Sequence, residues 1–201
     1  MTPRLWVFAG PNGAGKTTLA RQYVVGRIEI VNPDEIARQI DPQHFDDARV
    51  IALAGRQAVE RRRVLLAAGQ TFGIETTLTG RGGLAFMAEA RERGFKVNLV
   101  FIGIKDAQQS FSRVGARVEL GGHTVPDDAI ARRFNQSMGN LPEAMKLADR
   151  ALVFDNTGKR RRLILSRENG RTKLVSRNLP QWAREAIPAG VRRMPHKGLE
   201  L

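Results

Sequence analysis

The chain has 201 residues, of which 42% are hydrophobic, and it carries a formal net charge of +13 and no cysteine. This apolar fraction suits one packed domain and excludes a disordered chain, while the lack of cysteine excludes disulfides and thiolate metal sites. No apolar run approaches the ~20 residues that cross a bilayer. We therefore expect a cytoplasmic protein that has no membrane partner.

Hydrophobic periodicity and turn residues predict strands that alternate with helices along most of the chain. Strands are expected at residues 4–8, 27–32, 71–77, 95–104 and 150–156. Helices are expected at residues 17–25, 33–40, 46–69, 81–94, 106–122 and 125–148, the last of them bent at Pro142. This alternation predicts a mostly parallel, five-stranded sheet that helices cover on both faces.

After these elements the pattern changes. Residues 161–177 contain two short alternating runs around Glu168-Asn169-Gly170, which is the signature of a β-hairpin. We expect the hairpin to cap the core and the last stretch of about 20 residues to be loosely ordered. The predicted division is a core over residues 1–158 and a basic hairpin with its tail over residues 159–201.

The basic excess is concentrated in this C-terminal segment. Residues 159–201 contain 12 basic and 3 acidic side chains, whereas residues 1–158 contain 21 and 17. Such a segment can contact nucleic acid or an acidic partner protein. It can also be a solvated basic surface, and we favour that interpretation because motifs that read bases are missing.

The stretch GPNGAGKTT at residues 10–18 has the spacing of a phosphate-binding loop. Its glycines let backbone N–H groups close around a phosphate, and the following helix directs its positive end at the same anion. We expect Lys16 to reach the β- and γ-phosphates and the Thr17 hydroxyl to bind Mg²⁺. The residues predicted to contact ATP in this stretch are Gly10, Asn12, Gly13, Ala14, Gly15, Lys16, Thr17 and Thr18.

Other features narrow the class of nucleotide-binding protein. GTP-binding switches usually carry an NKxD stretch that reads guanine, and this chain lacks one, so ATP is favoured over GTP. Motor and transporter ATPases need an apolar strand that ends in an acid. The nearest candidate is residues 99–106, whose Asp106 lies beyond the predicted strand. A small-molecule kinase remains.

Two acidic segments lie at the carboxyl ends of predicted strands, where the ligands of parallel sheets bind. Asp34 can accept the proton of an attacking hydroxyl, or it can cap a helix together with Glu35. Glu75, with Thr77 beside it, suits a Mg²⁺–water shell or a polyol substrate, or a capping cluster for the next helix. These residues alone leave both alternatives open for each segment.

Two predicted basic helices meet at Gly121-Gly122, an arrangement typical of a lid, here at about residues 106–148. Guanidinium groups in a lid neutralise charge on the transferring phosphate, and closure excludes water; the alternative is a solvated basic face. The arginines are Arg113, Arg117, Arg132 and Arg133. Helical spacing cannot turn all four inward. We favour Arg117 and Arg132 as catalytic cations, and Arg133 next, as a nucleotide contact.

These segments together resemble the short zeta-toxin-like P-loop kinases. The resemblance covers residues 4–156 and depends on GPNGAGKTT, VNPDEIA, FGIETTLTGR, RVELGGHTVPDDAIARRF and LVFDN, in this order. It implies an α/β fold, a P-loop kinase-type three-layer sandwich with a helical lid, and the C-terminal β-hairpin also suits the short members.

The resemblance implies an ATP-dependent kinase whose acceptor is a hydroxyl of a UDP-amino-sugar such as UDP-N-acetylglucosamine, with an antitoxin protein as a candidate partner. It implies that Asp34 is the catalytic base, that Lys16 and the lid arginines contact phosphates, and that Glu75 and Thr77 contact the substrate. The longer toxins carry an arginine two residues beyond the motif threonine. That position is Thr79 here, so the acceptor can differ.

Three functional hypotheses follow. The first is a kinase that moves the γ-phosphate of ATP to a hydroxyl on a small substrate. The second is a polynucleotide kinase or a nucleic-acid-associated ATPase, which the basic C-terminal segment motivates. The third is a non-catalytic module in which the nucleotide only stabilises a toxin–antitoxin complex.

Overall fold

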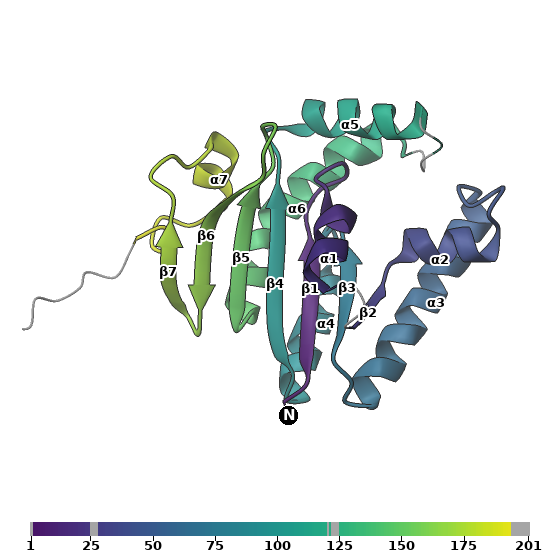
Figure 1. The fold of residues 1–201 in the computed structure, drawn as a ribbon, viewed down its shortest axis with the longest axis horizontal. Coiled ribbons are helices and arrows are strands. Elements are labelled where there is room, and N and C mark those ends of the chain that lie inside the picture. The colour runs from purple at the N-terminus through teal and green to yellow at the C-terminus, as the bar shows by residue number, and fades with distance from the viewer. Residues whose placement is uncertain (1, 25–27, 120, 122–124, 194–201) are drawn as a thin grey trace, which may run out of the picture.

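The computed structural model describes residues 2–24, 28–119, 121 and 125–193. Seven strands form one sheet in the order β2-β3-β1-β4-β5-β6-β7 (Figure 1). The strands are β1 (Arg4–Ala9), β2 (Glu29–Val31), β3 (Phe72–Thr76), β4 (Lys96–Gly103), β5 (Arg150–Asp155), β6 (Arg162–Glu168) and β7 (Arg171–Val175). The first five strands in this spatial order run parallel to one another. Strand β6 pairs antiparallel with β5, and β7 pairs antiparallel with β6.

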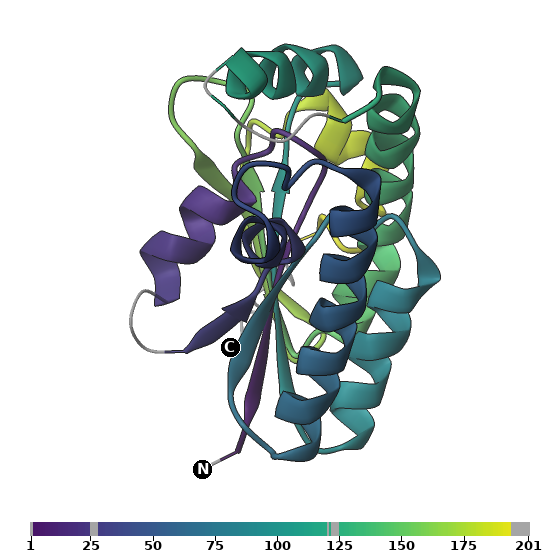
Figure 2. The same ribbon diagram turned by 90° about the vertical axis from the view of Figure 1, so that its right-hand side faces the viewer.

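Helices cover both faces of the sheet, so the molecule has three layers (Figure 2). The helices are α1 (Lys16–Val24), α2 (Pro33–Ile40), α3 (Ala48–Ala67), α4 (Arg81–Glu92), α5 (Ala107–Glu119), α6 (Asp127–Leu147) and α7 (Gln181–Ala186). Buried side chains of α3, α4, α6 and α7 pack on one face in the larger core cluster, and α1 packs on the other face. The α/β, P-loop kinase-type fold that the sequence predicts is confirmed.

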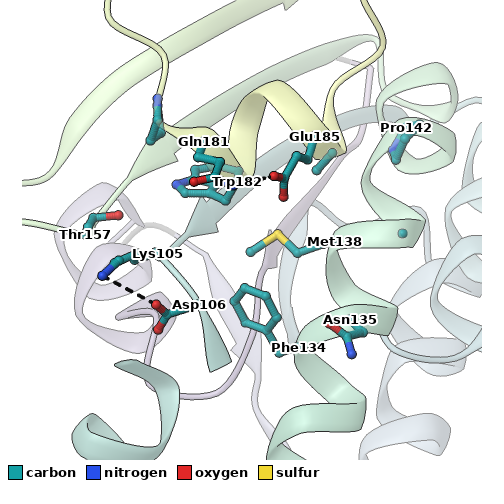
Figure 3. A pocket seen from close by; sticks show the side chains of 13 residues that line it. Lys105, Asp106, Phe134, Asn135, Met138, Pro142, Thr157, Gln181, Trp182 and Glu185 are labelled. Carbon is teal, nitrogen blue, oxygen red and sulfur yellow. Dashed lines mark hydrogen bonds and ion pairs between the residues drawn. The ribbon is translucent and has the colours of Figure 1, made fainter. Parts of the chain in front are cut away.

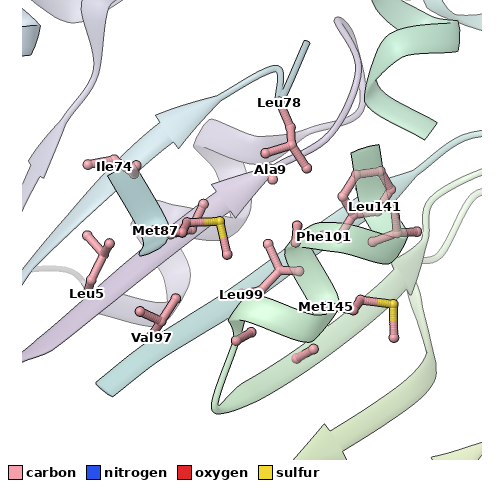
Figure 4. Packing of buried hydrophobic residues seen from close by; sticks show 14 of the residues in the cluster. Leu5, Ala9, Ile74, Leu78, Met87, Val97, Leu99, Phe101, Leu141 and Met145 are labelled. Atoms are coloured by element: carbon pink, nitrogen blue, oxygen red, sulfur yellow. The ribbon is translucent and has the colours of Figure 1, made fainter. Parts of the chain in front are cut away.

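The central strands alternate between the two core clusters. Leu99 and Phe101 of β4 point into the larger cluster (Figure 4), whereas Val100 and Ile102 point toward α1. All four side chains are completely buried. Strands that are apolar on both faces are typical of a parallel sheet covered by helices, which explains why this segment is an almost continuous apolar run.

The C-terminal hairpin extends the sheet, and this differs from the expected five strands with a separate cap. Strand β6 pairs antiparallel with β5, with Val153 opposite Leu165. Without β6, the backbone N–H and C=O groups on the outer side of β5 would form an open sheet edge. Ile164 and Leu165 are completely buried, so the hairpin also contributes apolar side chains to the larger cluster.

Helix α7 lies in the part of the chain that was expected to be loosely ordered, and for residues 181–186 that expectation is wrong. The helix has only six residues, too few to show a clear hydrophobic period. Its anchor is Trp182, which is 4% exposed and packs on the backbone of Gly103 at the end of β4. Residues 194–201 lie outside the described residues.

The predicted lid contains two kinds of packing, and the division of the chain into core and lid stays a prediction. Val114 of α5 packs with Ala129 and Ile130 of α6 in a small separate cluster. The second half of α6, with Leu141 and Met145, belongs to the larger core. Part of the predicted glycine hinge, including Gly122, lies outside the described residues.

Over the part of the chain that the structure describes, no helix combines the length and apolar character needed to cross a membrane.

Replacing Gly103 by alanine is expected to destabilise the protein. The added Cβ atom would lie 2.3–2.6 Å from three ring carbons of Trp182, so α7 would have to move. We expect a loss of about 1–3 kcal/mol in the free energy of unfolding, measured by urea denaturation. Gly55→Ala on α3 is the control, because nothing lies within 4 Å of its new Cβ, and it should gain up to about 1 kcal/mol. Equal stabilities for the two variants would contradict this account of Trp182.

Candidate active site

A cleft of about 510 Å³ lies at the carboxyl ends of β1, β2 and β3. It brings together eleven of the predicted site residues, from five separate parts of the chain. They are Asn12, Gly13, Gly15, Lys16, Thr17, Thr18, Asp34, Glu75, Thr77, Arg117 and Arg133. Gly10, Ala14 and Arg132 are not among the residues that line it. The site assignments themselves stay predictions.

A larger cavity, about 780 Å³, lies between α6, α7 and the turn that leads into α5 (Figure 3). Phe134, Met138 and Trp182 line it, together with the ion pair of Lys105 and Asp106. No residue of the phosphate-binding loop contributes to it. The chemistry suggested by the loop therefore belongs to the smaller cleft.

The phosphate-binding loop depends on glycine where it leaves β1. Gly10 has a φ of +141°, and a Cβ atom there would lie 2.2 Å from the carbonyl oxygen of Ile102 in the neighbouring strand β4. A larger residue is therefore excluded by both conformation and space. From this tight turn the chain loops over the end of the sheet and enters α1 at Lys16, so the helix begins at the cleft.

The Lys16 side chain folds back over the loop. Its Nζ donates to the carbonyl oxygens of Gly10 and Pro11, at 3.0 and 2.9 Å. Burial lowers the pKa of Lys16 to about 8. The negative charges of Glu75 and Asp34 act against this, while the positive charges of Arg117 and Arg133 lower the pKa further. A bound phosphate would favour the protonated lysine, because it adds negative charge beside it.

Glu75 accepts a hydrogen bond from the Thr17 hydroxyl, with Oγ1 and Oε2 separated by 2.9 Å. The glutamate is 7% exposed, and burial raises its pKa despite the Thr17 hydrogen bond and the nearby Lys16. Among the described residues, no group of three or more His, Cys, Asp or Glu could hold a metal ion. Two oxygen donors still fit Mg²⁺, which usually keeps several waters and binds substrate phosphates.

The acid at the end of a strand beside the loop is Glu75, on β3. Residues 99–106 are the nearest candidate in the sequence, but Asp106 accepts from the backbone N–H of Gln109 at the start of α5. Strand β3 pairs directly with β1, and Glu75 lies opposite Phe8. The sequence FGIE is itself an apolar strand that ends in an acid. Only the strand order shows that β3, and not the strand before Asp106, places its acid beside the phosphate-binding loop.

Asp34 lies at the start of α2 but does not cap it. The side-chain oxygen of Asn32 accepts from the backbone N–H of Asp34 at 2.9 Å and so provides the cap. Glu35 pairs with Arg21 at 2.9 Å. The Asp34 carboxylate is exposed and lines the cleft, which favours the catalytic interpretation over the capping one.

A strained turn after β3 presents two threonines to the cleft. Leu78, which is 1% exposed, has a φ of +57°, a conformation that costs free energy for a residue with a branched side chain. Its backbone is held by Thr76 Oγ1, which accepts from its N–H, and by Asn140, which donates to its carbonyl. Thr77 and Thr79 on either side line the cleft, with their hydroxyl oxygens 3.2 Å apart.

Three of the four arginines of the predicted lid line the cleft, and Arg132 does not. The predicted inward placement of Arg132 is therefore wrong. Arg132 is exposed and donates to Asp128 at 3.3 Å. Arg133 lines the cleft with Arg117. The reason is helical phase, because Arg133 lies one turn after the buried Ala129 and shares its face. Arg113, the fourth arginine, also lines the cleft, and its guanidinium donates to the carbonyl of Asn156 at 2.8 Å.

A buried carboxylate at the end of β5, which the sequence analysis did not identify, supports the loop from the other side. Asp155 accepts from the Thr157 hydroxyl at 2.6 Å, from Trp182 Nε1 at 3.1 Å and from Arg162 at 2.8 Å. The next residue, Asn156, donates to the carbonyl of Ala14 at 2.9 Å. The segment LVFDN therefore connects the hairpin and α7 to the phosphate-binding loop.

A sequence-family model described as an AAA domain matches residues 5–144. The chain belongs to this family. An uncharacterised protein of Haemophilus influenzae is 35% identical over 139 residues, a match that spans 65% of this chain and 97% of that protein.

Two solved structures have the same fold. A chain of the AvrRxo1-ORF1:-ORF2 crystal structure with ATP superposes with a TM-score of 0.73 at 16% identity, over 98% of this chain and 65% of that one. A chain of the PezAT toxin–antitoxin system of Streptococcus pneumoniae has a TM-score of 0.64 at 18% identity, over 92% and 82%. This chain thus spans just under two thirds of the AvrRxo1 chain. The likeness shows a common P-loop kinase fold.

Substituting Asp155 should change how stability depends on pH. Burial raises the pKa of Asp155, but the hydrogen bonds from Thr157, Arg162 and Trp182 outweigh burial and hold the pKa below its ordinary value. The carboxylate therefore stabilises the folded state fully above the ordinary pKa, and this contribution is lost as the pH falls through the folded pKa. Asp155→Asn should cost about 2 kcal/mol at pH 7.

The measurement is urea denaturation of both proteins between pH 3 and pH 7. The difference in unfolding free energy should shrink toward the acid end. A difference that stays constant over this range would show that the Asp155 charge contributes nothing to stability.

Proposed function

We propose that this protein is an ATP-dependent kinase that transfers the γ-phosphate to a hydroxyl of a small substrate of the UDP-amino-sugar type. The observation that carries this proposal is the arrangement of one cleft, in which Lys16, the Thr17–Glu75 pair and the Asp34 carboxylate all lie. Phosphoryl transfer needs little more than positioning and charge neutralisation, and these residues can supply both.

Each group has a role in this proposal. The loop N–H groups and Lys16 bind the β- and γ-phosphates, and Thr17 and Glu75 would hold Mg²⁺, which neutralises phosphate charge when bound. Asp34 accepts the proton of the acceptor hydroxyl while the oxygen of that hydroxyl forms a bond to the γ-phosphorus. The bond between that phosphorus and the β,γ-bridging oxygen breaks, and ADP leaves. Arg117 and Arg133 stabilise the transferring charge.

The acceptor class is the finer part of the proposal. Support comes from the resemblance to zeta-toxin-like kinases and from the hydroxyl of Thr77, which lines the same cleft as Asp34. The test is incubation with labelled ATP and a metabolite extract, followed by mass spectrometry for a new phosphorylated species. A UDP-amino-sugar product would support the acceptor assignment. An antitoxin partner stays a prediction.

Nucleic-acid binding through the basic hairpin is the weaker alternative. Several of its cations are used inside the protein. Arg161 donates to Gln22, Arg162 to Asp155, and Arg167 to the carbonyl of Met145. A chain of the Pnkp1/Rnl/Hen1 RNA repair complex shares the fold, with a TM-score of 0.53 at 19% identity over 67% of this chain and 44% of that one. The hydrogen bonds of Arg161, Arg162 and Arg167 within the protein favour a structural role for the hairpin.

Asp34→Asn is expected to abolish phosphoryl transfer and to leave ATP binding nearly intact. The amide keeps the size of the side chain but cannot accept the hydroxyl proton, so kcat should fall by about 10²–10⁴. Single-turnover kinetics and calorimetric titration with ATP measure the two effects. Asp46→Asn is the matched control, since Asp46 is an exposed aspartate outside the cleft. Full turnover in Asp34→Asn would overturn the base assignment.

Two neighbouring arginines of α6 provide an internal comparison. Arg133→Ala should lower kcat by about 10- to 1000-fold, since it removes a cation that faces the transferring phosphate. Arg132→Ala should change kcat less than threefold, because Arg132 pairs with Asp128 on the surface. Steady-state kinetics with the same acceptor measure both variants. The reverse order of effects would mean that the lid closes with a different face of α6 inward.

A further inference from the structure

Arg62 lies in the cleft without an acidic partner. It is the middle member of three consecutive arginines on α3, and the other two face elsewhere. Arg61 pairs with both carboxylate oxygens of Glu29, at 2.7 and 2.6 Å, and Arg63 is exposed. Arg62 lines the cleft, and no ion pair or hydrogen bond joins it to any residue that the structure describes.

Helical spacing explains how a cation reaches this position. The buried residues of α3 include Ala54, Ala58 and Leu65, and Arg62 continues that stripe, four residues after Ala58 and three before Leu65. The two alanines leave room for a longer side chain. Side chains on a helix lean toward its N-terminus, and α3 begins at the end of the sheet where the cleft lies (Figure 1).

The position is unfavourable for an unliganded protein. The Arg62 side chain is half-buried, and its Nε atom is fully buried without a hydrogen-bond partner. Burial lowers the pKa of Arg62, yet a guanidinium stays charged in proteins. A buried donor without an acceptor is rare in native structures and calls for an explanation such as an absent ligand.

The location of Arg62 indicates which ligand it contacts. Arg62 lines the same cleft as Asp34, the proposed base. Helix α3 packs against α2, which carries Asp34 at its start, so Arg62 is on the acceptor side of the cleft.

We propose that Arg62 binds an oxyanion, a phosphate or a carboxylate, on the acceptor, so that the substrate is an anionic alcohol. This rests on the proposed kinase function, because it takes the Asp34 side as the acceptor site. The planar guanidinium fork matches both oxyanions and can bind either through two hydrogen bonds. Arg62 then determines specificity, because a neutral alcohol would leave its buried Nε without an acceptor.

The first experiment measures oxyanion binding without catalysis. A non-hydrolysable ATP analogue and excess Mg²⁺ fill the nucleotide site, and the protein is then titrated with inorganic phosphate or with malonate while the melting temperature is followed. We expect wild type and the control Arg63→Gln to bind at least one of the two anions, and to show the same saturation midpoint for it. Arg62→Gln should bind it about 10- to 100-fold more weakly, the loss expected for hydrogen bonds to a charged group.

The comparison of phosphate with malonate distinguishes the two oxyanions. The same saturation midpoint in Arg62→Gln and Arg63→Gln, or no saturable binding of either anion to wild type, would overturn the proposal. In the absence of ligand, Arg62→Gln should melt at or above the wild-type temperature, since it removes a partly buried charge. A melting temperature several degrees lower would assign Arg62 a structural role instead.

The second experiment separates this proposal from the kinase function. A metabolite extract is divided by anion exchange into neutral and anionic pools, and each is incubated with labelled ATP. Product from the anionic pool, with KM raised in Arg62→Gln and unchanged in Arg63→Gln, supports both proposals. Product from the neutral pool alone overturns the role of Arg62 and the UDP-amino-sugar acceptor, and keeps the kinase. Without product from either pool the kinase assignment fails, and the binding titrations still decide what Arg62 does.

Discussion

The whole site depends on the way the carbonyl groups of the phosphate-binding loop are occupied. Five consecutive carbonyl oxygens, from Gly10 to Ala14, each accept a hydrogen bond from a side chain. Lys16 donates to Gly10 and Pro11, Ser110 to Asn12, Arg113 to Gly13, and Asn156 to Ala14. Because these carbonyl groups are engaged, the loop N–H groups other than that of Ala14, which donates to the Pro11 carbonyl, are left for an anion.

This arrangement makes the loop a product of distant parts of the chain. Ser110 and Arg113 come from the first turns of α5, and Asn156 follows β5. Asp155, which precedes Asn156, is held by Trp182 of α7 and Arg162 of β6. Only Lys16 belongs to the loop itself, and its two hydrogen bonds to carbonyls leave the third N–H of its ammonium group for a phosphate. The C-terminal hairpin and α7 therefore support the phosphate-binding loop, although neither lines the cleft.

Local features of the site could be predicted from the sequence, and features that depend on tertiary contacts could not. The loop follows from its own spacing, and Asp34 follows from its place after β2. The phase of α6 depends on the burial of Ala129, so the sequence did not distinguish Arg132 from Arg133. Arg62 is different, because its spacing from Ala58 is visible in the sequence. An arginine on an apolar stripe is a recognisable signal there, and the three-arginine run concealed it.

The elements of the fold also divide into those that local sequence predicts and those that depend on tertiary contacts. Strand β4 is buried on both faces and has an unmistakable apolar run, and the helices that flank it have clear ends. The hairpin was recognisable from Asn169-Gly170, but its pairing with β5 satisfies a sheet edge that no local pattern describes. Helix α7 depends on a single tryptophan and on the absence of a side chain at Gly103. Both are contacts across long stretches of sequence.

Several unfavourable features of the molecule lie in or beside the cleft. Leu78 is held in a left-handed conformation, Arg62 has a buried donor without a partner, and the Lys16 ammonium is buried enough to lower its pKa. Among the residues that the structure describes, those of β1 and β4 have no comparable defect, and the stability of these strands can maintain the strained groups. A ligand that supplies anionic oxygens on both sides of the cleft would satisfy Lys16 and Arg62 together. The substrates then complete interactions that the protein alone leaves open.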